Sequence, residues 1–396
     1  PEGKAFYSHN RSRKGPVGRS VDDPGVKEVM PVTIRKITKE TGEAAILGGA
    51  VLGGGGGGSM DKGRMNVLGA LEAGEVTLVD IDDVSPDTVL VTGSAVGAPA
   101  AKEASVEPHD YVRVVEILME NGCPKPGGFI PNECGGSSIT NGWVPSALMG
   151  IPVIDALCNG RAHPTGVMGS MGLHRDPSYV SRQAAAGGSR EKGLYIEMHA
   201  AGRLESASSL VRSAAEKSGG LVAVARNPVT ADFTKKNGAC GALQQAIDLG
   251  MKMKQAMGGG GSAVLEAVLG FLGGDHIVTG RVSAREILTR GGFDSGSIAV
   301  GDFETTFWNE YMTLERDGKR IATFPDLIMT LDAGTGMPVT TAEVSEGQEV
   351  ILFVVPSECL ILGEGMRCME LLETVEPVVG KKIVEYLRKE GTCSCP

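Results

Sequence analysis

The sequence has few aromatic residues and no long hydrophobic stretch. Phenylalanine, tryptophan and tyrosine make up 4% of the 396 residues, whereas glycine, with 58 residues, has about twice its usual share. Glycine or charge interrupts every apolar stretch well short of a membrane span. The first residues contain arginines without the apolar core of a signal peptide. We therefore expect a cytoplasmic protein with no membrane segment and with closely packed backbone in its core.

Basic patches and cysteine motifs are also missing. The net charge is −10 and no long basic patch occurs, which argues against nucleic-acid binding. The eight cysteines are scattered, apart from Cys393 and Cys395, as is typical of a reduced protein rather than a disulfide framework. Neither C-x-x-C nor H-x-x-x-H occurs, so spacing alone indicates no metal site. A zinc site is the alternative if His163, His174 and His199 converge.

The most prominent feature that is present is a run of six glycines at residues 53–58. It lies between an apolar segment that ends at Leu52 and a predicted helix that begins at Met60. Because six glycines lose much conformational freedom on folding, we expect the run to let backbone N–H groups approach a ligand closely. The Walker A pattern fails, since Ser59 and Met60 stand where a lysine is needed. A flexible linker is the alternative. The predicted substrate-binding residues here are Gly54, Gly55, Gly56, Gly57, Gly58 and Ser59.

Strands alternate with helical patterns over the first two thirds of the chain. This predicts an α/β fold with a mainly parallel sheet and flanking helices. From about residue 276, short alternating strands between turn signals predict a smaller β-barrel or sandwich. The first residues have little periodicity, and we expect them to pack on another subunit of a homo-oligomer. The expected parts are a loosely ordered arm (1–30), an α/β domain (31–192), a second α/β segment packing on the first (193–275), a β-barrel domain (276–356), and a C-terminal helix and tail (357–396).

Polar residues gather just after the predicted strands. Ligands bind beyond the carboxyl ends of parallel strands, where the loops with Glu133, Asp155 and Arg161 should meet. A carboxylate there can act as a general base or bind ring N–H groups, and Arg161 can hold an oxyanion. Internal ion pairs that only pin the loops are the alternative. The predicted catalytic residues are Glu133, Cys134, Asp155, Arg161 and His163, and Asn132, Gly135 and Gly136 are predicted to bind substrate.

Cys134 is the most interesting thiol because it lies in a glycine loop near a predicted helix. At a helix N-terminus its pKa would fall and the thiolate could act as a nucleophile. The alternative is a small residue that fills a tight turn.

Several short motifs follow one another in a specific order. They are the glycine run and residues 131–136, 150–155, 160–164, 307–310, 324–328 and 336–341. In this order the chain resembles the S-methyl-thiohydantoin desulfurase-like family over roughly residues 38–356. The resemblance implies an α/β domain joined to a smaller β-barrel domain. The glycine run is longer than is usual in that family, and Cys134 and His163 stand where an apolar and an aromatic residue are commoner.

The resemblance also implies an activity, the removal of sulfur from a thiohydantoin-type ring. We therefore expect a hydrolase that acts on a small five-membered heterocycle, converting an S-methyl-thiohydantoin to a hydantoin and methanethiol. Glu133 or Asp155 would activate water, or Cys134 would attack directly, while glycine N–H groups and Arg161 stabilise negative charge. A non-catalytic metabolite-binding or assembly subunit that partners a hydantoinase-like enzyme is the alternative.

Overall fold

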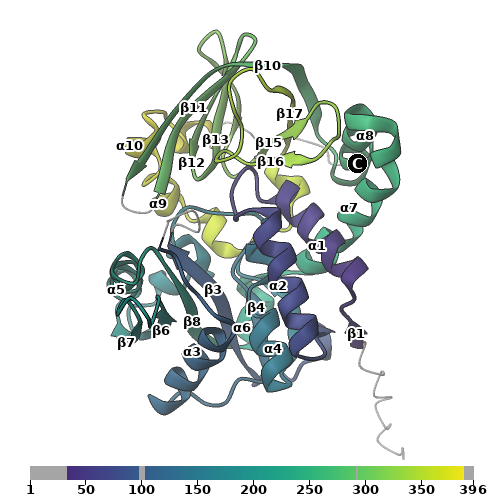
Figure 1. Ribbon diagram of the computed structural model, residues 1–396. Helices are drawn as coiled ribbons and strands as arrows, with labels where there is room; N and C mark the ends of the chain where they lie inside the picture. Colours follow the sequence, from purple (N-terminus) through teal and green to yellow (C-terminus); the bar gives the residue numbers. More distant parts are fainter. Residues whose placement is uncertain (1–33, 98–102, 291–292, 388–396) are drawn as a thin grey trace, which may run out of the picture. The chain divides into compact units, whose positions relative to one another are not determined.

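The computed structural model describes residues 34–97, 103–290 and 293–387 (Figure 1). The predicted N-terminal arm and the tail with Cys393 and Cys395 lie outside these residues. None of the described helices is long and apolar enough to cross a membrane.

The larger sheet is mixed. Its strand order is β1-β2-β5-β4-β3-β8-β6-β7, and β9 pairs with β5. The strands β2, β5, β4 and β3 are parallel, as predicted, and β8, β6 and β7 extend the sheet in antiparallel pairs. The segment expected to form a second α/β unit therefore contributes strands to the same sheet. The bounds are β1 Ile34–Lys36, β2 Thr77–Asp80, β3 Val89–Gly97, β4 Gly128–Pro131, β5 Val153–Leu157, β6 Ser181–Gly187, β7 Ile196–Gly202, β8 Leu221–Thr230 and β9 Ala239–Cys240.

Helices cover this sheet and also pack on one another. The first, α1, begins after Thr38, whose side chain accepts a hydrogen bond from Thr41 N, and it continues through Gly48 to Leu52. A Cβ at Gly48 would meet the carbonyl oxygen of Ala246 on α7, and a Cβ at Gly250 would meet that of Ala44 on α1. The two helices therefore approach closely. The bounds are α1 Lys39–Leu52, α2 Met60–Ala73, α3 Pro108–Glu120, α4 Trp143–Met149, α5 Leu204–Lys217, α6 Ala231–Asn237, α7 Ala242–Ala256 and α8 Gly260–Leu272.

The smaller sheet is antiparallel, with the order β14-β13-β12-β11-β10-β17-β15-β16. The long strand β10 pairs with β17 over its first half and with β11 over its second. The described strands β14 and β16 do not pair, so the predicted barrel is not closed. The hydroxyls of Tyr311 on β13 and Thr330 on β15 lie 3.0 Å apart, so these non-adjacent strands pack together. The bounds are β10 Asp275–Arg290, β11 Phe293–Val300, β12 Phe303–Trp308, β13 Glu310–Arg316, β14 Lys319–Thr323, β15 Leu327–Asp332, β16 Pro338–Val339 and β17 Glu349–Val355.

The C-terminal segment contains short helices in place of the single helix predicted for residues 357–396. The helices are α9 Met369–Leu372, α10 Glu376–Val379 and α11 Val384–Leu387. Gly380 adopts the left-handed conformation, with φ at 67°, and ends α10. Glu315 on β13 ties the segment to the sheet through Lys381, with a 2.6 Å contact, and also binds Arg320.

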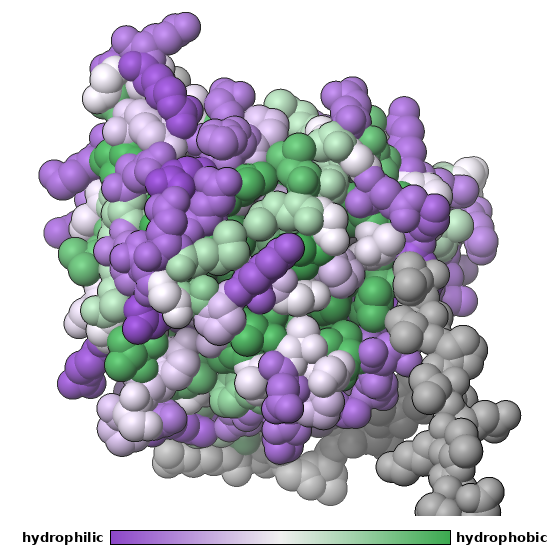
Figure 2. All heavy atoms as spheres, turned by 90° about the horizontal axis from the view of Figure 1, so that it is seen from below, coloured by the Kyte–Doolittle hydropathy of each residue, from purple (hydrophilic) through white to green (hydrophobic). Residues whose placement is uncertain are grey.

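Exposed hydrophobic side chains occur on several elements. Met65 and Leu68 on α2 are 64% and 44% exposed, and Leu148 on α4 is 47% exposed. On the face shown in Figure 2, hydrophobic residues gather towards the middle, with hydrophilic residues between and around them. The buried core is shared by both sheets, because one cluster joins Leu78 of β2 and Phe129 of β4 with Phe353 of β17.

Candidate active site

The glycine run is packed against polar residues from distant parts of the chain. A Cβ at Gly54 would meet the guanidinium of Arg161, and one at Gly56 would meet the carboxyl group of Glu310. Gly57 lies against the backbone of Gly135 in the same way, and its φ of 76° also favours glycine. Glycine is therefore needed here for close approach, and the run is not a free linker.

Hydrogen bonds hold the run on two sides. The N–H groups of Tyr311 and Thr341 donate to the carbonyl oxygens of Gly54 and Gly55, at 2.9 and 3.0 Å. On the other side, Ser138 N–H donates to Gly57 at 3.0 Å. Within the described part of the chain, the N–H groups of Gly57 and Gly58 make no hydrogen bond, so they are available to a ligand.

Ser59 has a structural contact. Its side chain accepts a hydrogen bond from Lys62 N at 3.3 Å and caps the N-terminus of α2. A contact between this hydroxyl and substrate would compete with the cap.

Glu133 and His163 form a close pair at the end of β4. Glu133 Oε2 lies 2.9 Å from His163 Nδ1 and also accepts the His163 backbone N–H at 3.2 Å. Asn132 Nδ2 donates to the same oxygen at 3.2 Å. The His163 side chain is 1% exposed and the Glu133 side chain 13%, so the carboxylate is the more accessible partner. The structure thus brings together three of the residues predicted from the sequence.

Two further residues, Arg226 and Asn159, contact Asn132 and His163. Arg226 on β8 donates to Asn132 Oδ1 at 2.7 Å. Burial lowers the pKa of Arg226, and Cys158 and Glu133 oppose the shift. Asn159 Nδ2 lies 3.3 Å from His163 Nδ1 and donates to Met168 O at 3.0 Å. Neither residue could be predicted from the sequence, because each acts through contacts between distant segments.

Arg161 is fully buried beside the glycine run. Its guanidinium donates to the carbonyl oxygens of Pro325, at 2.9 Å, of Tyr311, at 3.3 Å, and of Asp326. It also lies over the Phe324 ring, 4.6 Å from the centroid. Burial lowers the pKa of Arg161 to about 10, partly opposed by the charges of Glu310 and Asp326. At neutral pH the side chain is therefore still a cation.

Glu310 is a further site residue that sequence reasoning missed. It is buried at the start of β13, and within the described chain its Oε2 has no hydrogen-bond partner. Burial raises the pKa of Glu310 well above its usual range, the charge of Glu133 adds to this, and Arg161 opposes it. Such a shift favours the protonated form of the carboxyl group, which is the form that can donate a proton. The motif at residues 307–310 was a signal, but nothing local marked Glu310 as functional.

Cys134 differs from the sequence prediction. The residue is fully buried, and burial, with the charges of Glu133 and Asp155, raises the pKa of its thiol. The expected lowering of the pKa is therefore wrong, since the segment after Cys134 begins with the 3₁₀ turn Ser138–Thr140 rather than a long helix. The packing of Gly135 and Gly136 against the backbone of the glycine run and of residue 60 agrees with the alternative of a tight turn.

Asp155 contacts the start of α7 and Arg35. Its Oδ1 accepts the N–H groups of Leu243 and Gln244 at the start of α7, both at 3.1 Å. Its Oδ2 lies 3.3 Å from the guanidinium of Arg35. Burial raises the pKa of Asp155, opposed first by the hydrogen bond from Gln244. These contacts match the alternative of an internal pair that pins two elements.

The three candidate histidines have different neighbours. His163 contacts Glu133, whereas His174 Nε2 lies 3.0 Å from Glu370. His199 is on β7, and burial, with the charge of Arg182, lowers its pKa. Within the described residues, the side chains that could jointly hold a metal ion are His174, Cys368 and Glu370, whose ligand atoms lie within 4.8 Å of one another.

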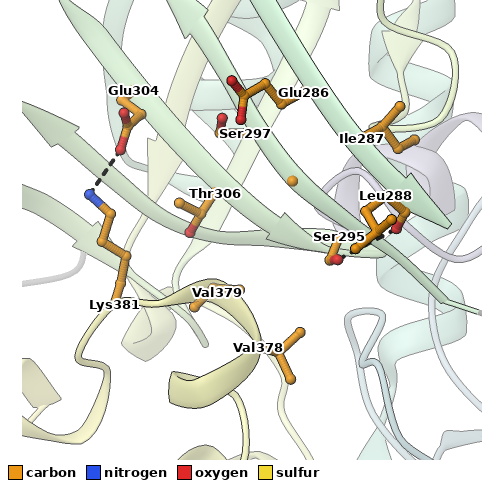
Figure 3. A pocket seen from close by; sticks show the side chains of 11 residues that line it. Glu286, Ile287, Leu288, Ser295, Ser297, Glu304, Thr306, Val378, Val379 and Lys381 are labelled. Carbon is orange, nitrogen blue, oxygen red and sulfur yellow. Dashed lines mark hydrogen bonds and ion pairs between the residues drawn. The ribbon is translucent and has the colours of Figure 1, made fainter. Parts of the chain in front are cut away.

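A surface groove of about 490 Å³ lies on the smaller sheet (Figure 3). Strands β10, β11 and β12 form one wall and α10 the other, and the Lys381–Glu304 ion pair, at 2.8 Å, closes one end. None of the residues around the glycine run lines this groove. The groove and the candidate active site are therefore separate.

In comparisons with known proteins, two family models match consecutive parts of the chain. The family model described as "S-Me-THD-like, N-terminal domain" matches residues 43–190, and "S-Me-THD-like, C-terminal domain" matches residues 203–371. A crystal structure of a protein from Chromobacterium violaceum is 18% identical, with a TM-score of 0.67, and the match covers 90% of this chain and 98% of that one. At this identity the likeness shows the fold alone. None of the curated proteins matches the chain.

Proposed function

Because the chain belongs to the S-Me-THD-like family, we propose that it hydrolyses a five-membered ring of the S-methyl-thiohydantoin type to a hydantoin and methanethiol. The observation that carries the proposal is the Glu133–His163 pair, which shares one site with the buried carboxyl of Glu310 and with Arg161. Such a site holds one carboxylate that can accept a proton and one carboxyl that can give a proton.

Glu133 is the base in this proposal. The Nε2 side of His163 is closed by Gly169, where a Cβ would clash with the ring, so His163 orients Glu133 and does not meet water itself. Glu133 takes a proton from water while the oxygen bonds to the ring carbon that carries sulfur. The electrons of the C=N bond move to the ring nitrogen, which takes the proton of Glu310. The positive charge of Arg161 and the N–H groups of Gly57 and Gly58 support the negative charge that develops.

Collapse of the tetrahedral centre completes the reaction. The new hydroxyl returns a proton to Glu310 as the C=O bond forms. The C–S bond breaks, and methanethiolate takes the proton held by Glu133. One water molecule is consumed, and both carboxyl groups regain their starting states.

Thiol release from an S-methyl-thiohydantoin tests the proposal. We expect Glu133→Gln and Glu310→Gln each to lower kcat by about 10²- to 10⁴-fold, the usual contribution of acid–base groups. Asp155→Asn removes a carboxylate of the α7 cap, and Cys134→Ala removes a buried thiol, so both should stay within a few-fold of the wild type. Full activity in Glu133→Gln would exclude this mechanism.

A second outcome addresses the alternative of a non-catalytic subunit. If the purified wild type releases no thiol but is stabilised against heat by the ring compound, the chain binds without turnover. We expect turnover, since a binding module has no need of a buried proton donor.

A further inference from the structure

A second group of polar side chains lies outside the candidate active site. His174 is in the 3₁₀ turn Leu173–Arg175, and Cys368 and Glu370 come from the C-terminal segment. A ring nitrogen of His174, the Cys368 Sγ and a Glu370 carboxyl oxygen lie within 4.8 Å of one another. Imidazole, thiolate and carboxylate are the three ligand types that Zn²⁺ takes in proteins.

The imidazole of His174 has too few partners for its burial. The side chain is 8% exposed and contacts Glu370 through Nε2 at 3.0 Å. Its Nδ1 is buried and has no hydrogen bond within the described residues. A buried polar ring with a single hydrogen bond is costly, and a ligand that bound its unpartnered nitrogen would offset that cost.

The charges around His174, Cys368 and Glu370 favour the binding of a cation. Without an ion, burial raises the pKa of Cys368 to about 11 and keeps the thiol protonated, and Glu364 and Glu370 face the single positive charge of Arg175. When a metal ion binds, Cys368 loses its proton, and three negative charges then face Arg175 and the ion. One divalent ion brings the sum to zero.

Arg175 is compatible with such an ion. It binds both oxygens of Glu370, at 2.6 and 2.9 Å, and Glu364 at 3.0 Å. A carboxylate has about four acceptor positions, so Glu370 can accept Arg175 and also bind a metal. Hydrogen bonds of this kind orient ligating carboxylates. A tetrahedral Zn²⁺ holds its ligand atoms roughly 3.5 Å apart, so the group need contract only by about 1 Å.

We propose that His174, Cys368 and Glu370 bind Zn²⁺, with water as the fourth ligand, and that the ion fixes the C-terminal segment against the loop carrying Arg161 and His163. The segment just before Cys368 lies on that loop. A Cβ at Gly363 would meet Cys158 O and the side chain of Asn159, and one at Gly365 would meet Met168 O. Asn159 in turn contacts His163. The ion therefore acts at a distance from the reacting atoms and positions the loop through this packing.

Metal analysis of the full chain tests the site. The protein is purified without a histidine tag or added metal, and its zinc content is measured. It is then stripped with a chelator and titrated with zinc chloride against a competing chromophoric chelator. We expect about one ion per chain. In Cys368→Ser and His174→Gln the affinity should fall by more than the roughly 10- to 100-fold typical of lost outer-shell partners.

Cys359→Ser is the matched control, since Cys359 is a thiol of the same segment outside the ligand group. Its zinc affinity should equal that of the wild type. Replacing zinc by Co²⁺ should give a thiolate-to-cobalt absorption band in the wild type and in Cys359→Ser, but not in Cys368→Ser. This readout depends on the thiolate and not on activity, and circular dichroism checks that each variant is folded.

Three results would overturn the proposal. They are a stripped wild type that binds no zinc, variants that bind zinc as tightly as the wild type, and a cobalt complex without the thiolate band. The last two would show an ion held elsewhere. Zinc binding and the cobalt band of the wild type test the proposal even if Cys368→Ser fails to fold. None of these results depends on the proposed reaction.

Discussion

The pKa of the Glu310 carboxyl group depends strongly on its buried surroundings. Its carboxyl lies against Gly56, in a site that also contains the charges of Arg161 and Glu133. Burial favours the neutral form, and this raises the pKa of the group in the folded state. In the unfolded chain the same group would ionise in its ordinary range.

This difference predicts a pH-dependent stability. Below the unfolded pKa of about 4.5, Glu310 is protonated in both states. As the pH rises above this value, the unfolded state loses the proton while the folded state keeps it, so stability falls until the pH reaches the folded pKa. Glu310→Gln lacks this loss. The free energy of unfolding of the variant minus that of the wild type, measured in urea from pH 5 to 8, should therefore increase with pH.

Glu304→Gln is the control for this series, because Glu304 lies on the adjacent strand β12 and its side chain is 52% exposed. Its stability should follow that of the wild type across the range. A difference between Glu310→Gln and the wild type that does not change with pH would contradict the raised pKa.

Among the elements, the pair α1 and α7 depends most clearly on glycine. Gly48 and Gly250 leave no room for a methyl group, because each faces a carbonyl oxygen of the other helix. Gly69 on α2 is different, since a Cβ there would meet nothing within 4 Å. The same residue type therefore serves close packing at two positions and has no packing role at the third.

Alanine substitutions should separate these cases. Gly48→Ala and Gly250→Ala force the helices apart and should each destabilise the protein by about 1–3 kcal/mol, as overpacking does. Gly69→Ala should stabilise it by about 0.5–1 kcal/mol, because alanine restricts the unfolded chain and favours the helix. Urea unfolding measures all three. Equal effects at Gly48 and Gly69 would contradict the close approach of α1 and α7.

Local patterns predicted most elements, because the apolar periodicity of a helix or strand is contained within the element. The helix from Met60 to Ala73 and the short strands after residue 276 were found in this way. The strand β6 was missed, since its run of Ala184, Ala185 and Ala186 has neither branched nor aromatic side chains. Glu310, Asn159 and Arg226 were missed for another reason, because their roles arise only when distant segments meet. The contact of Asp155 with α7 could not be predicted either, since its helix partner is almost ninety residues later.

At the scale of the whole molecule, the regions matched by the two family models share one core. The cluster that contains Ile46 and Phe129 also contains Leu327 and Phe353. Arg161 adds a polar link, because it comes from the first region and donates to carbonyl groups of the second. We therefore expect both regions to unfold together.

Calorimetry of the wild type and of Arg161→Met tests this expectation. The wild type should show one heat-absorption peak. The variant leaves the buried carbonyls of Pro325 and Tyr311 without their donor, and should lose about 1–3 kcal/mol for each group left unsatisfied. Arg64→Met, at a side chain 36% exposed, should cost at most about 1 kcal/mol. Two separate peaks in the wild type would contradict the shared core.

The hydrogen bonds of Gly54 and Gly55 with Tyr311 and Thr341 also limit how this protein can be recombined. A chimaera that joins the first half of one family member to the second half of another must match the glycine run to the surface it touches. A residue with a side chain at position 56 would need a shorter residue than Glu310 opposite it. Chimaeras that exchange whole halves should therefore fail to fold more often than chimaeras that exchange the glycine run together with β13. In libraries of variants, these two segments should come from the same parent.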